Sequence, residues 1–375
     1  MSTETLGFET YFRRIQDPRR CPYHLLIDIF GIAICATIAG ANDWPQIEEF
    51  GKTHEAWLRR FFKLPYGIPS HDTFERVFER IKPSAFHAAF LDWMHALAEV
   101  LGLKHIALDG KTLRHSGSAA KGLKALHLVS AWAVENQLSL GQVAVDDKSN
   151  EITAIPRLLA LLELNGALVT IDAMGCQKDI AKKIREGGGD YVLTVKDNQP
   201  HLLEDIQACL QEAFDREDKD PRLDHWQTQE KGHGRTERRS YTVLHDPVGI
   251  RGQEAWQDLC VVGMCTSERT VRDQTSVEVR YFIGSRRADA KVYGQALRNH
   301  WSIENQLHWQ LDVTFHEDAN REHGRHAAEN LAAIRKIALA LLQQDASKGS
   351  LRCKRLRAAY SVEFLEKVIR NCVNL

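Results

Sequence analysis

The sequence predicts an α+β protein in which a helical N-terminal domain precedes a mixed β-sheet flanked by helices. Residues 1–100 show helix-type spacing of apolar residues and contain no alternating stretch typical of strands. From residue 103 onward, short runs rich in Val, Leu and Ile are bounded by Gly, Asn, Asp or Lys, which is typical of strands. With 375 residues, 43% hydrophobic and 26% charged, the chain is long enough for two or three globular domains.

The N-terminal part is predicted to form helices at 23–39, 44–62, 71–81 and 84–101. Within it, the nearly apolar stretch 25–41 follows Arg19 and Arg20, so it is either a buried helix or a membrane anchor. A spanning helix needs about 20 apolar residues, and Asp28 interrupts this stretch. The amphipathic pattern at 44–62 needs a partner surface, so we expect a buried helix and no membrane contact.

The middle of the chain has the element order β-β-β-α-β-α-β. Short connections between the first three strands allow an antiparallel meander, whereas the crossover helices require the last two strands to run parallel to a neighbour. This element order is the one found in the ribonuclease-H-like fold. The strands are expected at 105–109, 125–134, 138–145, 167–172 and 190–195, with helices at 151–164 and 176–186.

The remainder is predicted to be a β-rich insertion followed by helices. A helix at 201–218 leads into strands at 236–245, 257–267 and 275–285, so the insertion lies at about 220–285. Helices at about 289–311 and at 327–344 follow, and Trp301 and Trp309 are expected in the core. The expected domains are therefore 1–101, helical; 102–345, sheet with insertion; and 346–375, a basic tail.

Charge and cysteine content exclude several classes of protein. Lys and Arg number 49 against 50 Asp and Glu, so any nucleic-acid contact must be local rather than spread over a basic surface. The eight cysteines contain no Cys-x-x-Cys pair, which argues against a structural zinc cluster. We expect reduced thiols in a cytoplasmic protein.

Two aspartates mark the ends of strands that this fold places side by side. Asp109 ends the first strand and is followed by Gly110, and Asp172 ends the fourth. Two carboxylates this close repel each other unless a cation lies between them, and Mg²⁺ prefers such oxygen ligands. The alternative is that each aspartate only caps the turn that follows it.

Glu304 is the third candidate ligand. It lies on the predicted helix 289–311, on the same side as Ile303 and Leu307, with His300 and His308 one turn away on either side. A carboxylate on an inward helix face needs a partner. Three carboxylates can hold two metal ions about 3.5–4 Å apart for in-line displacement at phosphorus. The alternative is a surface glutamate.

Several long motifs resemble those of one family. They are LDGKTLR (108–114), VTIDAMGCQKDIAKKI (169–184), YVLTVKDNQP (191–200), GHGRTERR (232–239) and RNHWSIENQLHWQLDVTFHEDANR (298–321), with PSHDTFERVF (69–78) in the helical part. With these motifs the chain resembles DDE-type insertion-sequence transposases of the H-repeat-associated branch, over nearly its whole length.

The resemblance implies a DNA transposase that cuts at element ends and transfers the 3′-hydroxyl into target DNA. It implies Asp109, Asp172 and Glu304 as the catalytic, metal-binding triad, with two Mg²⁺ ions, for which Mn²⁺ can substitute, and no small-molecule cofactor. The expected partners are the element ends, target DNA and a second or further copies of the chain. The expected location is the bacterial cytoplasm, on the nucleoid when DNA is bound.

One departure concerns the contacts to the DNA end. Many related transposases carry a Tyr-Arg-Glu-Lys signature around the glutamate, but this chain has Leu297, His300 and Leu311 at the other three positions. The DNA contacts of that signature are therefore not carried over, and Arg298 is a substitute beside His300. The expected DNA-binding residues are Lys111, Lys196, Arg235, Arg238, Arg239, Arg298 and His300.

Other functions remain open from the sequence. A ribonuclease-H-like nuclease would share the triad but only hydrolyse, and a repurposed or catalytically silent chain would only bind DNA. The basic tail either contacts DNA or is an amphipathic helix. A glycosidase is disfavoured because two acids would suffice for it and the basic segments would have no use.

Overall fold

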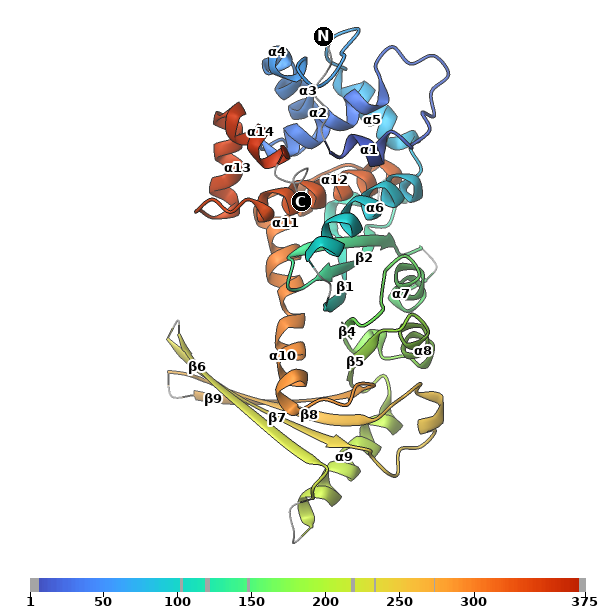
Figure 1. The fold of residues 1–375 in the computed structure, drawn as a ribbon, viewed down its shortest axis with the longest axis vertical. Helices are drawn as coiled ribbons and strands as arrows, with labels where there is room; N and C mark the ends of the chain where they lie inside the picture. The colour runs from blue at the N-terminus through green and yellow to red at the C-terminus, as the bar shows by residue number, and fades with distance from the viewer. Residues whose placement is uncertain are drawn as a thin grey trace. The chain divides into compact units, whose positions relative to one another are not determined.

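The computed structural model describes residues 7–101, 104–118, 122–146, 149–216, 220–232, 234–272 and 274–370. The chain divides into two compact units (Figure 1). The first, here called the helical unit, comprises Met1–Leu103, Gly110–Asp147 and Glu304–Leu375. The second, the sheet unit, comprises Lys104–Asp109 and Lys148–Ile303. The units follow packing rather than chain order, because the first and last segments of the chain share one unit.

The N-terminal helices of the helical unit form where the sequence predicts them, except that the segment 44–62 is split at His54. Trp44–Thr53 begins at Asp43, whose carboxylate accepts a hydrogen bond from the Gln46 amide at 2.9 Å. The helices are α1 (Glu9–Phe12), α2 (Leu26–Ile38), α3 (Trp44–Thr53), α4 (Glu55–Leu58), α5 (His71–Arg80) and α6 (Pro83–Leu101).

Helix α2 is the buried helix expected at 23–39. Every residue from Asp28 to Ile38 is buried. The Asp28 carboxylate accepts a hydrogen bond from the Leu64 amide at 2.8 Å, which provides the partner that a buried polar group requires. Within the described part of the chain, no helix combines the length and the apolar character needed to cross a bilayer.

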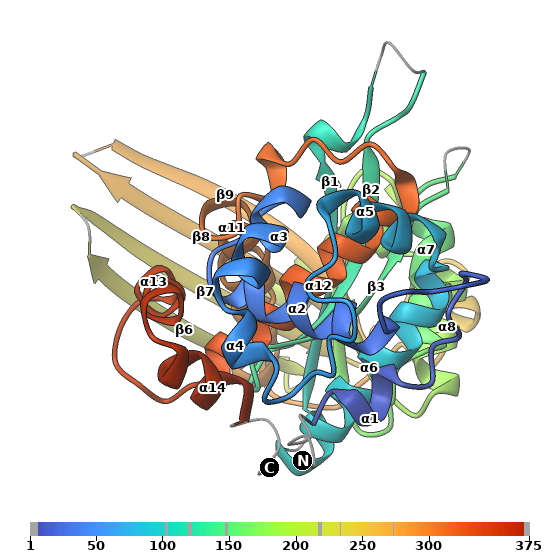
Figure 2. The ribbon, with the colours of Figure 1, turned by 90° about the horizontal axis from the view of Figure 1, so that it is seen from above.

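The C-terminal helices complete the helical unit. Helix α12 (Arg325–Gln344) packs against α2, α5, α6 and a strand of this unit (Figure 2). Helices α13 (Leu351–Tyr360) and α14 (Val362–Arg370) pack on each other, on α12 and on α2. The segment expected as a basic tail therefore consists, as far as Arg370, of two packed helices.

Arg355 shows how a basic residue of this segment is used within the fold. Its guanidinium is buried and donates hydrogen bonds to the Thr37 carbonyl at 3.1 Å and the Ala41 carbonyl at 2.9 Å, and another to the Thr314 carbonyl. It also lies 4.4 Å from the centre of the Phe315 ring. Burial, with the nearby charge of Arg335, lowers the pKa of Arg355 to about 10. This arginine joins segments of the fold instead of meeting solvent.

The sheet has the strand order expected of the ribonuclease-H-like fold. Strand β1 (His105–Leu113) contributes to both units. In the helical unit β2 (Leu126–Ala133) and β3 (Leu138–Ala144) form an antiparallel pair, and in the sheet unit β1, β4 (Leu168–Ile171) and β5 (Asp190–Val195) run parallel. The full order is β3-β2-β1-β4-β5-β9-β8-β7-β6. The prediction of a mixed sheet is thus confirmed.

The predicted insertion continues this sheet instead of forming a separate one. Strand β9 (Gln274–Gly284) pairs antiparallel with β5, and β8 (Val261–Val271), β7 (Arg235–His245) and β6 (Leu223–Gly232) follow in order. Strand β6 was not predicted because its sequence, LDHWQTQEKG, is largely polar and lacks the apolar alternation of a half-buried strand. Helices α7 (Glu151–Leu159), α8 (Lys178–Glu186) and α9 (Pro200–Asp215) also belong to the sheet unit.

The expected helix at 289–311 is not continuous. Helix α10 (Ala290–His300) ends, a π-helical segment (Ile303–His308) follows, and α11 (Trp309–Val313) resumes the α-helix. Trp301 and Trp309 are 42% and 54% exposed, so the expectation that both lie in the core was wrong. Helix periodicity alone could not show this, because the wider π-turn shifts which residues face the interior.

Candidate active site

Asp109 and Asp172 follow directly on paired positions of neighbouring parallel strands in the sheet unit. The register of β1 and β4 runs from His105 opposite Leu168 to Leu108 opposite Ile171. One further residue on each strand brings Asp109 opposite Asp172. Since parallel neighbouring strands lie about 4.8 Å apart, the two carboxylates leave the sheet at the same edge. The structure therefore brings together these two members of the expected triad.

The electrostatics of this pair suit a divalent cation. Loss of water, the charge of Asp109 and the charge of Glu151 raise the pKa of the Asp172 carboxyl. Asp172 is exposed and Asp109 half-buried, so an ion in solution can reach both. Carboxylate oxygens are the ligands that Mg²⁺ prefers, and a cation relieves the repulsion between them. The residues present thus fit a metal ion.

Asp172 also caps the turn that follows it, as the alternative interpretation expected. Its side chain accepts a hydrogen bond from the Met174 amide at 3.2 Å, at the start of the 3₁₀ turn Ala173–Gly175. The loop after β5 supports the same turn, since Asn198 donates to the Ala173 carbonyl at 2.7 Å and Gln199 to the Cys176 carbonyl at 2.9 Å. The backbone next to Asp172 is therefore held from two sides.

A chain of hydrogen bonds ties α10 to the strands that carry the aspartates. The Thr170 hydroxyl bonds to His105 Nε2 at 2.8 Å and to His300 Nδ1 at 2.9 Å. Burial, with the charge of His300 as a smaller cause, lowers the pKa of His105 to about 3, so this ring is neutral. Thr170 precedes Asp172 by two residues and shares its face of the sheet. His300, expected to contact DNA, thus has a hydrogen bond that positions the end of α10, and no sequence signal pointed to Thr170.

Glu304 belongs to the helical unit, whereas the two aspartates belong to the sheet unit. It lies in the π-helical segment and is exposed, while Ile303 and Leu307 are buried. The expectation that Glu304 shares the inward side with them was therefore wrong. Short π-helical segments often occur at functional sites. Among the described residues, no group of three His, Cys, Asp or Glu side chains is arranged to hold a metal ion.

Lys111 is engaged within the helical unit. It is largely buried and forms ion pairs with Asp312 and Glu317. Burial by itself would lower the pKa of Lys111, but the charge of Glu317 and the hydrogen bonds that Lys111 donates to both carboxylates outweigh it and raise this pKa. Lys111 was expected either to contact a DNA phosphate or to lie in solvent. In the structure it pairs with two carboxylates instead. Asp312 and Glu317, considered only as loop residues or a second metal set, are its partners.

Lys336 on α12 is a second buried lysine in this unit. It donates hydrogen bonds to the Ser130 hydroxyl at 2.8 Å and to the Gln142 side chain. Burial, the largest cause, lowers the pKa of Lys336 to about 7, although Glu317 partly opposes the shift. Lysine in an unfolded chain has a pKa near 10.4, so between pH 7 and 10 the unfolded state binds more protons than the folded state.

The free energy of unfolding is therefore expected to rise with pH over this interval. Lys336 alone contributes up to about 1.4 kcal/mol per pH unit. Urea denaturation of the wild type and of Lys336→Met between pH 7 and 9.5 measures the contribution, and the variant should show the flatter curve. Lys348→Met, at an exposed site, is the matched control. Parallel curves for wild type and Lys336→Met would contradict the lowered pKa.

The face of the sheet that carries Asp109 and Asp172 continues onto strands β9, β8 and β7. Paired residues point to the same face and side chains alternate along a strand. The same face therefore continues from β5 to β9 through the pair Thr194–Phe282, from β9 to β8 through Cys265–Arg280, and from β8 to β7 through Tyr241–Cys265. Near α10 it is apolar, with Val192, Phe282 and Tyr293 in one buried cluster. Beyond the end of α10 it bears four arginines, here called the arginine face: Arg235, Arg239, Arg269 and Arg280.

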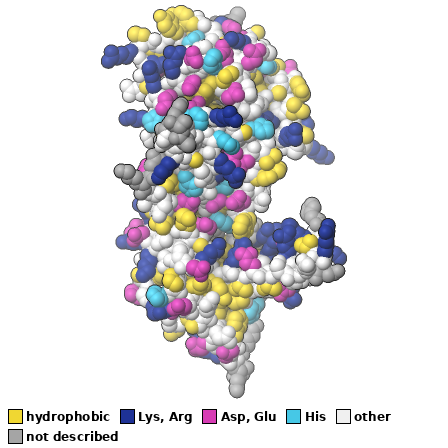
Figure 3. Space-filling model, turned by 180° about the vertical axis from the view of Figure 1, so that it is seen from behind, with side chains coloured by type: hydrophobic (Ala, Val, Ile, Leu, Met, Phe, Trp, Pro, Cys, Tyr) yellow, Lys and Arg dark blue, Asp and Glu magenta, His cyan; other side chains and the backbone are white. Residues whose placement is uncertain are grey.

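The arginine face lies past the edge where the aspartates leave the sheet. The last pair between β5 and β9 is Val195–Tyr281, so residues 274–280 of β9 extend beyond β5. Exposed Lys196 follows Val195 at this edge. Figure 3 shows dark blue side chains gathered on this projecting arm. Arg238 alternates with Arg239 and lies on the opposite face, so the three arginines predicted from GHGRTERR do not form one patch.

Glutamates partly balance the arginine face. Glu237 pairs with Arg235 at 2.9 Å and also with Arg239, and Glu230 pairs with Arg298 at 3.2 Å. Arg280 lies 4.9 Å from the centre of the Trp301 ring. The Arg239–Glu237 pair is largely buried, whereas the side chains of Arg235, Arg269 and Arg298 are more exposed, so an incoming phosphate competes most readily for these three.

Comparison with known proteins gives a consistent result. The family profile described as "DDE_Tnp_1-associated" matches residues 9–94, and "Transposase DDE domain" matches residues 101–341. The chain is 42% identical to "Putative transposase YncI" of Escherichia coli O157:H7 over 94% of this chain and 91% of that protein. It is 40% identical to "H repeat-associated putative transposase YhhI" of Escherichia coli (strain K12) over 92% of each.

A solved structure, a piggyBac transposase synaptic complex with hairpin DNA, is similar at a TM-score of 0.43 and 10% identity, covering 98% of this chain and 77% of that one. The family assignment comes from the profiles and the sequence relatives. The DDE profile alone spans more than half of the chain, including Asp109, Asp172 and Glu304. This chain therefore belongs to the DDE transposase family.

Proposed function

We propose that this DNA transposase cuts the ends of an insertion sequence and joins the freed 3′-hydroxyl to target DNA, with Asp109, Asp172 and Glu304 as metal ligands. The observation that carries the proposal is the aspartate pair at one sheet edge, with its raised Asp172 pKa. Mg²⁺ is the preferred ion and Mn²⁺ a substitute, because all three donors are carboxylates. When bound, two such ions supply the positive charge that in-line displacement at phosphorus requires.

Each residue of the site has a separate task in this proposal. Asp109 and Asp172 bind the metal ions from the sheet. The paired strands and the hydrogen bond from Asn198 to the turn after Asp172 limit their movement. Glu304 joins them from the π-helical segment that follows α10, and the His300–Thr170 hydrogen bond positions the end of that helix. In each strand transfer a 3′-oxygen forms a bond to the target phosphorus as another 3′-oxygen leaves, so no covalent enzyme intermediate is needed.

DNA is proposed to approach along the arginine face. This face and the aspartates share one side of the sheet unit, and Lys196 lies at the edge between them. Phosphate contacts of this kind orient a duplex without reading its sequence. Arg298, which is exposed at the end of α10 and pairs with Glu230 at 3.2 Å, extends the same surface. Lys111 is held by two carboxylates, and we give it a structural task instead.

Replacing Arg235 and Arg239 together with Ala is expected to weaken binding to a duplex carrying an element end. Each phosphate contact contributes a slope of about −0.9 in log K against log salt, so the double variant should lose up to about 1.8. Arg238→Ala, on the opposite face of the same strand, is the matched control and should leave the slope unchanged. If Arg238→Ala lowered the slope by as much as the replacement of Arg235 or of Arg239 does, the DNA path would lie elsewhere.

A strand-transfer assay tests the proposed function directly. Purified protein, Mg²⁺, a labelled element end and a plasmid target are combined, and joined products are counted apart from cut products. Joined products are expected. Cut ends without joining would identify a nuclease, and binding without cutting would identify a silent DNA-binding protein.

The assembly and location follow from the same proposal. Two element ends must be held together for transposition, so we propose a homodimer or larger assembly on DNA, in the bacterial cytoplasm. Sedimentation of the protein with and without an element end measures the change in assembly that DNA causes.

A further inference from the structure

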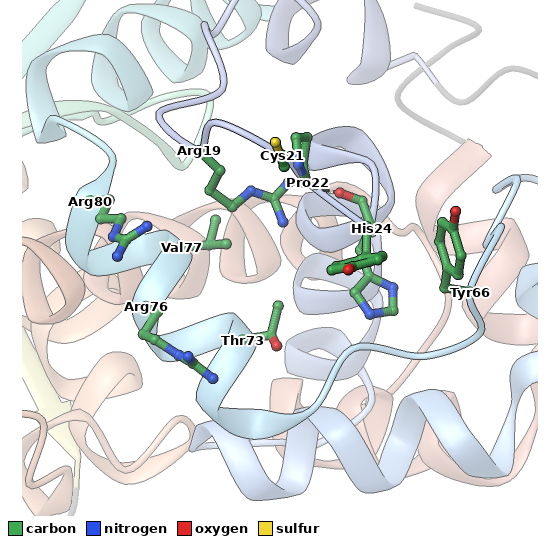
Figure 4. Close-up of a pocket in the computed structure, with 10 residues that line it drawn as sticks. Arg19, Cys21, Pro22, His24, Tyr66, Thr73, Arg76, Val77 and Arg80 are labelled. Carbon is green, nitrogen blue, oxygen red and sulfur yellow. Dashed lines mark hydrogen bonds between the residues drawn. The ribbon is translucent and has the colours of Figure 1, made fainter.

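A cavity of about 420 Å³ lies in the helical unit, and none of the residues that line it was given a role above. Helix α5 forms one wall and the loop before α2 forms another (Figure 4). Binding pockets for small ligands have volumes of about 300–1,000 Å³, so this one is of usable size. The residues that line it are Arg19, Cys21, Pro22, Tyr23, His24, Tyr66, Thr73, Arg76, Val77 and Arg80.

The cavity is positively charged. Three of the ten lining residues are arginines, and none of the ten is Asp or Glu. Arg76 and Arg80 lie one turn apart on α5 and are exposed. Arg19 is held in place, since it forms an ion pair with Asp17 at 2.7 Å and donates to the His24 carbonyl at 2.7 Å. Arg76 donates to the Asp72 carbonyl at 2.9 Å and forms an exposed 4.0 Å ion pair with the Asp72 carboxylate. Because such an exposed pair is weak, an anion can compete for Arg76 and can also meet Arg80.

The cavity also presents flat aromatic surface. Tyr23 and Tyr66 are 70% and 66% exposed, and their rings meet edge to face with centres 5.4 Å apart. Exposed large aromatic side chains of this kind often mark a binding site. Beside them, His24 Nδ1 is buried and has no hydrogen-bond partner in the described part of the chain. Burial and the charge of Arg19 lower the pKa of His24, so this ring adds no positive charge to the cavity near neutral pH.

We propose that this cavity binds an unpaired nucleotide of a DNA strand, with phosphate on Arg76 and Arg80 and the base stacked on Tyr23 or Tyr66. Cationic side chains beside exposed aromatic rings are the combination by which proteins bind single strands. A base inside a duplex cannot present its face to a tyrosine, so the ligand is a frayed, cut or extruded nucleotide. The proposal rests on the proposed function, because strand cutting at element ends exposes such nucleotides.

Cys21 allows the cavity to be tested without measuring activity. Its thiol is exposed and lines the cavity, and exposed Cys353 on α13 lies outside the lining set. The full-length protein is treated with N-ethylmaleimide, without metal ions, in the presence of a 12-nucleotide single strand. Mass spectrometry of peptides then gives the alkylation rate of each cysteine. The single strand is expected to slow alkylation of Cys21 and leave that of Cys353 unchanged.

Two further probes identify what the cavity recognises. An abasic single strand of equal length lacks the stacking base and is expected to protect Cys21 less. A blunt duplex is also expected to protect it less. Equal protection by the abasic strand would overturn base stacking, and equal protection by the duplex would overturn the preference for unpaired nucleotides. Equal reactivity of Cys21 with and without the single strand would overturn the site itself.

Variants separate the two parts of the cavity. Tyr23→Ala with Tyr66→Ala is expected to weaken single-strand binding about 5- to 150-fold, whereas the paired Tyr→Phe changes keep the rings and the affinity. Arg76→Gln with Arg80→Gln should lower the salt slope by about 1.4, from about 0.7 per phosphate. The control, Lys52→Gln with Arg59→Gln, removes the same charge from exposed sites of the same unit and should change nothing.

The result of the Cys21 protection experiment and the result of the strand-transfer assay can be told apart. A chain that joins no DNA ends but still protects Cys21 would contradict the proposed function alone. A chain that joins ends while Cys21 stays fully reactive would contradict the cavity alone.

Discussion

Asp109→Asn, Asp172→Asn and Glu304→Gln are each expected to reduce strand cleavage at an element end by at least about 10³-fold. The loss of one carboxylate charge removes several kcal/mol of stabilisation of the transition state, and about 4 kcal/mol corresponds to this factor. Binding to the same DNA should persist, because each change removes a negative charge that repels phosphate. Cleavage is measured on a labelled duplex in Mg²⁺, and binding on the same duplex without metal.

The variant Asp172→Asn distinguishes the proposed metal binding of Asp172 from its role in capping the turn. Asparagine caps a turn about as well as aspartate, so Asp172→Asn keeps the hydrogen bond to the Met174 amide and loses only the charge. If Asp172 were only a cap, the variant would cleave at the wild-type rate. Asp179→Asn, at an exposed site on α8, is the matched control and should cleave normally. Near-normal cleavage by any one triad variant would remove that residue from the triad.

Arg355→Met is expected to cost about 3 kcal/mol or more of folding stability. The change leaves the carbonyls of Thr37, Ala41 and Thr314 without the donor that they share. A buried polar group without a partner costs about 1–3 kcal/mol. Urea denaturation followed by circular dichroism measures the loss. Arg352→Met, at an exposed site on the same helix, should change stability by less than about 0.5 kcal/mol.

This result bears on the proposed DNA surface. If the segment 347–370 were a DNA-binding tail, Arg355→Met would weaken DNA binding and leave stability unchanged. Because Lys354 is also buried and Lys367 pairs with Asp345 at 3.0 Å, we expect the opposite. Equal stability of Arg355→Met and Arg352→Met would contradict the packing of α13 described above.

The sequence predicted that Asp109 and Asp172 lie close together because their positions depend on local rules. Short apolar runs identify β1 and β4, and crossover helices force parallel neighbours. The sequence predicted that β1 ends at Asp109, but the strand continues to Leu113, so the two aspartates meet through the parallel register of β1 and β4. The observed register, with Leu108 opposite Ile171, agrees with that expectation. Glu304 was identified by its motif and by helix spacing, and its place as a third ligand stays a proposal.

The partners of charged residues could not be predicted in the same way. Lys111 and Arg355 read as solvent or DNA contacts, yet their partners Asp312 and Thr37 are distant in the sequence. Charge identifies what a side chain can bind, but not which of many oppositely charged or polar groups the fold brings near. The same holds for the cavity at Arg76, whose aromatic wall comes from segments outside α5.

By itself, the sequence determined strands β1 to β5 with helices α7 and α8, their order in the sheet and the place where two carboxylates meet, because periodicity and chain connectivity act over short distances. The tertiary structure alone decided that the last helices complete the first unit and that β6 to β9 extend the central sheet. It also decided that Arg235 and Arg239 of β7 share a face with Arg269 of β8 and Arg280 of β9. These outcomes depend on long-range packing and on the register between strands, and neither leaves a periodic signal in the chain.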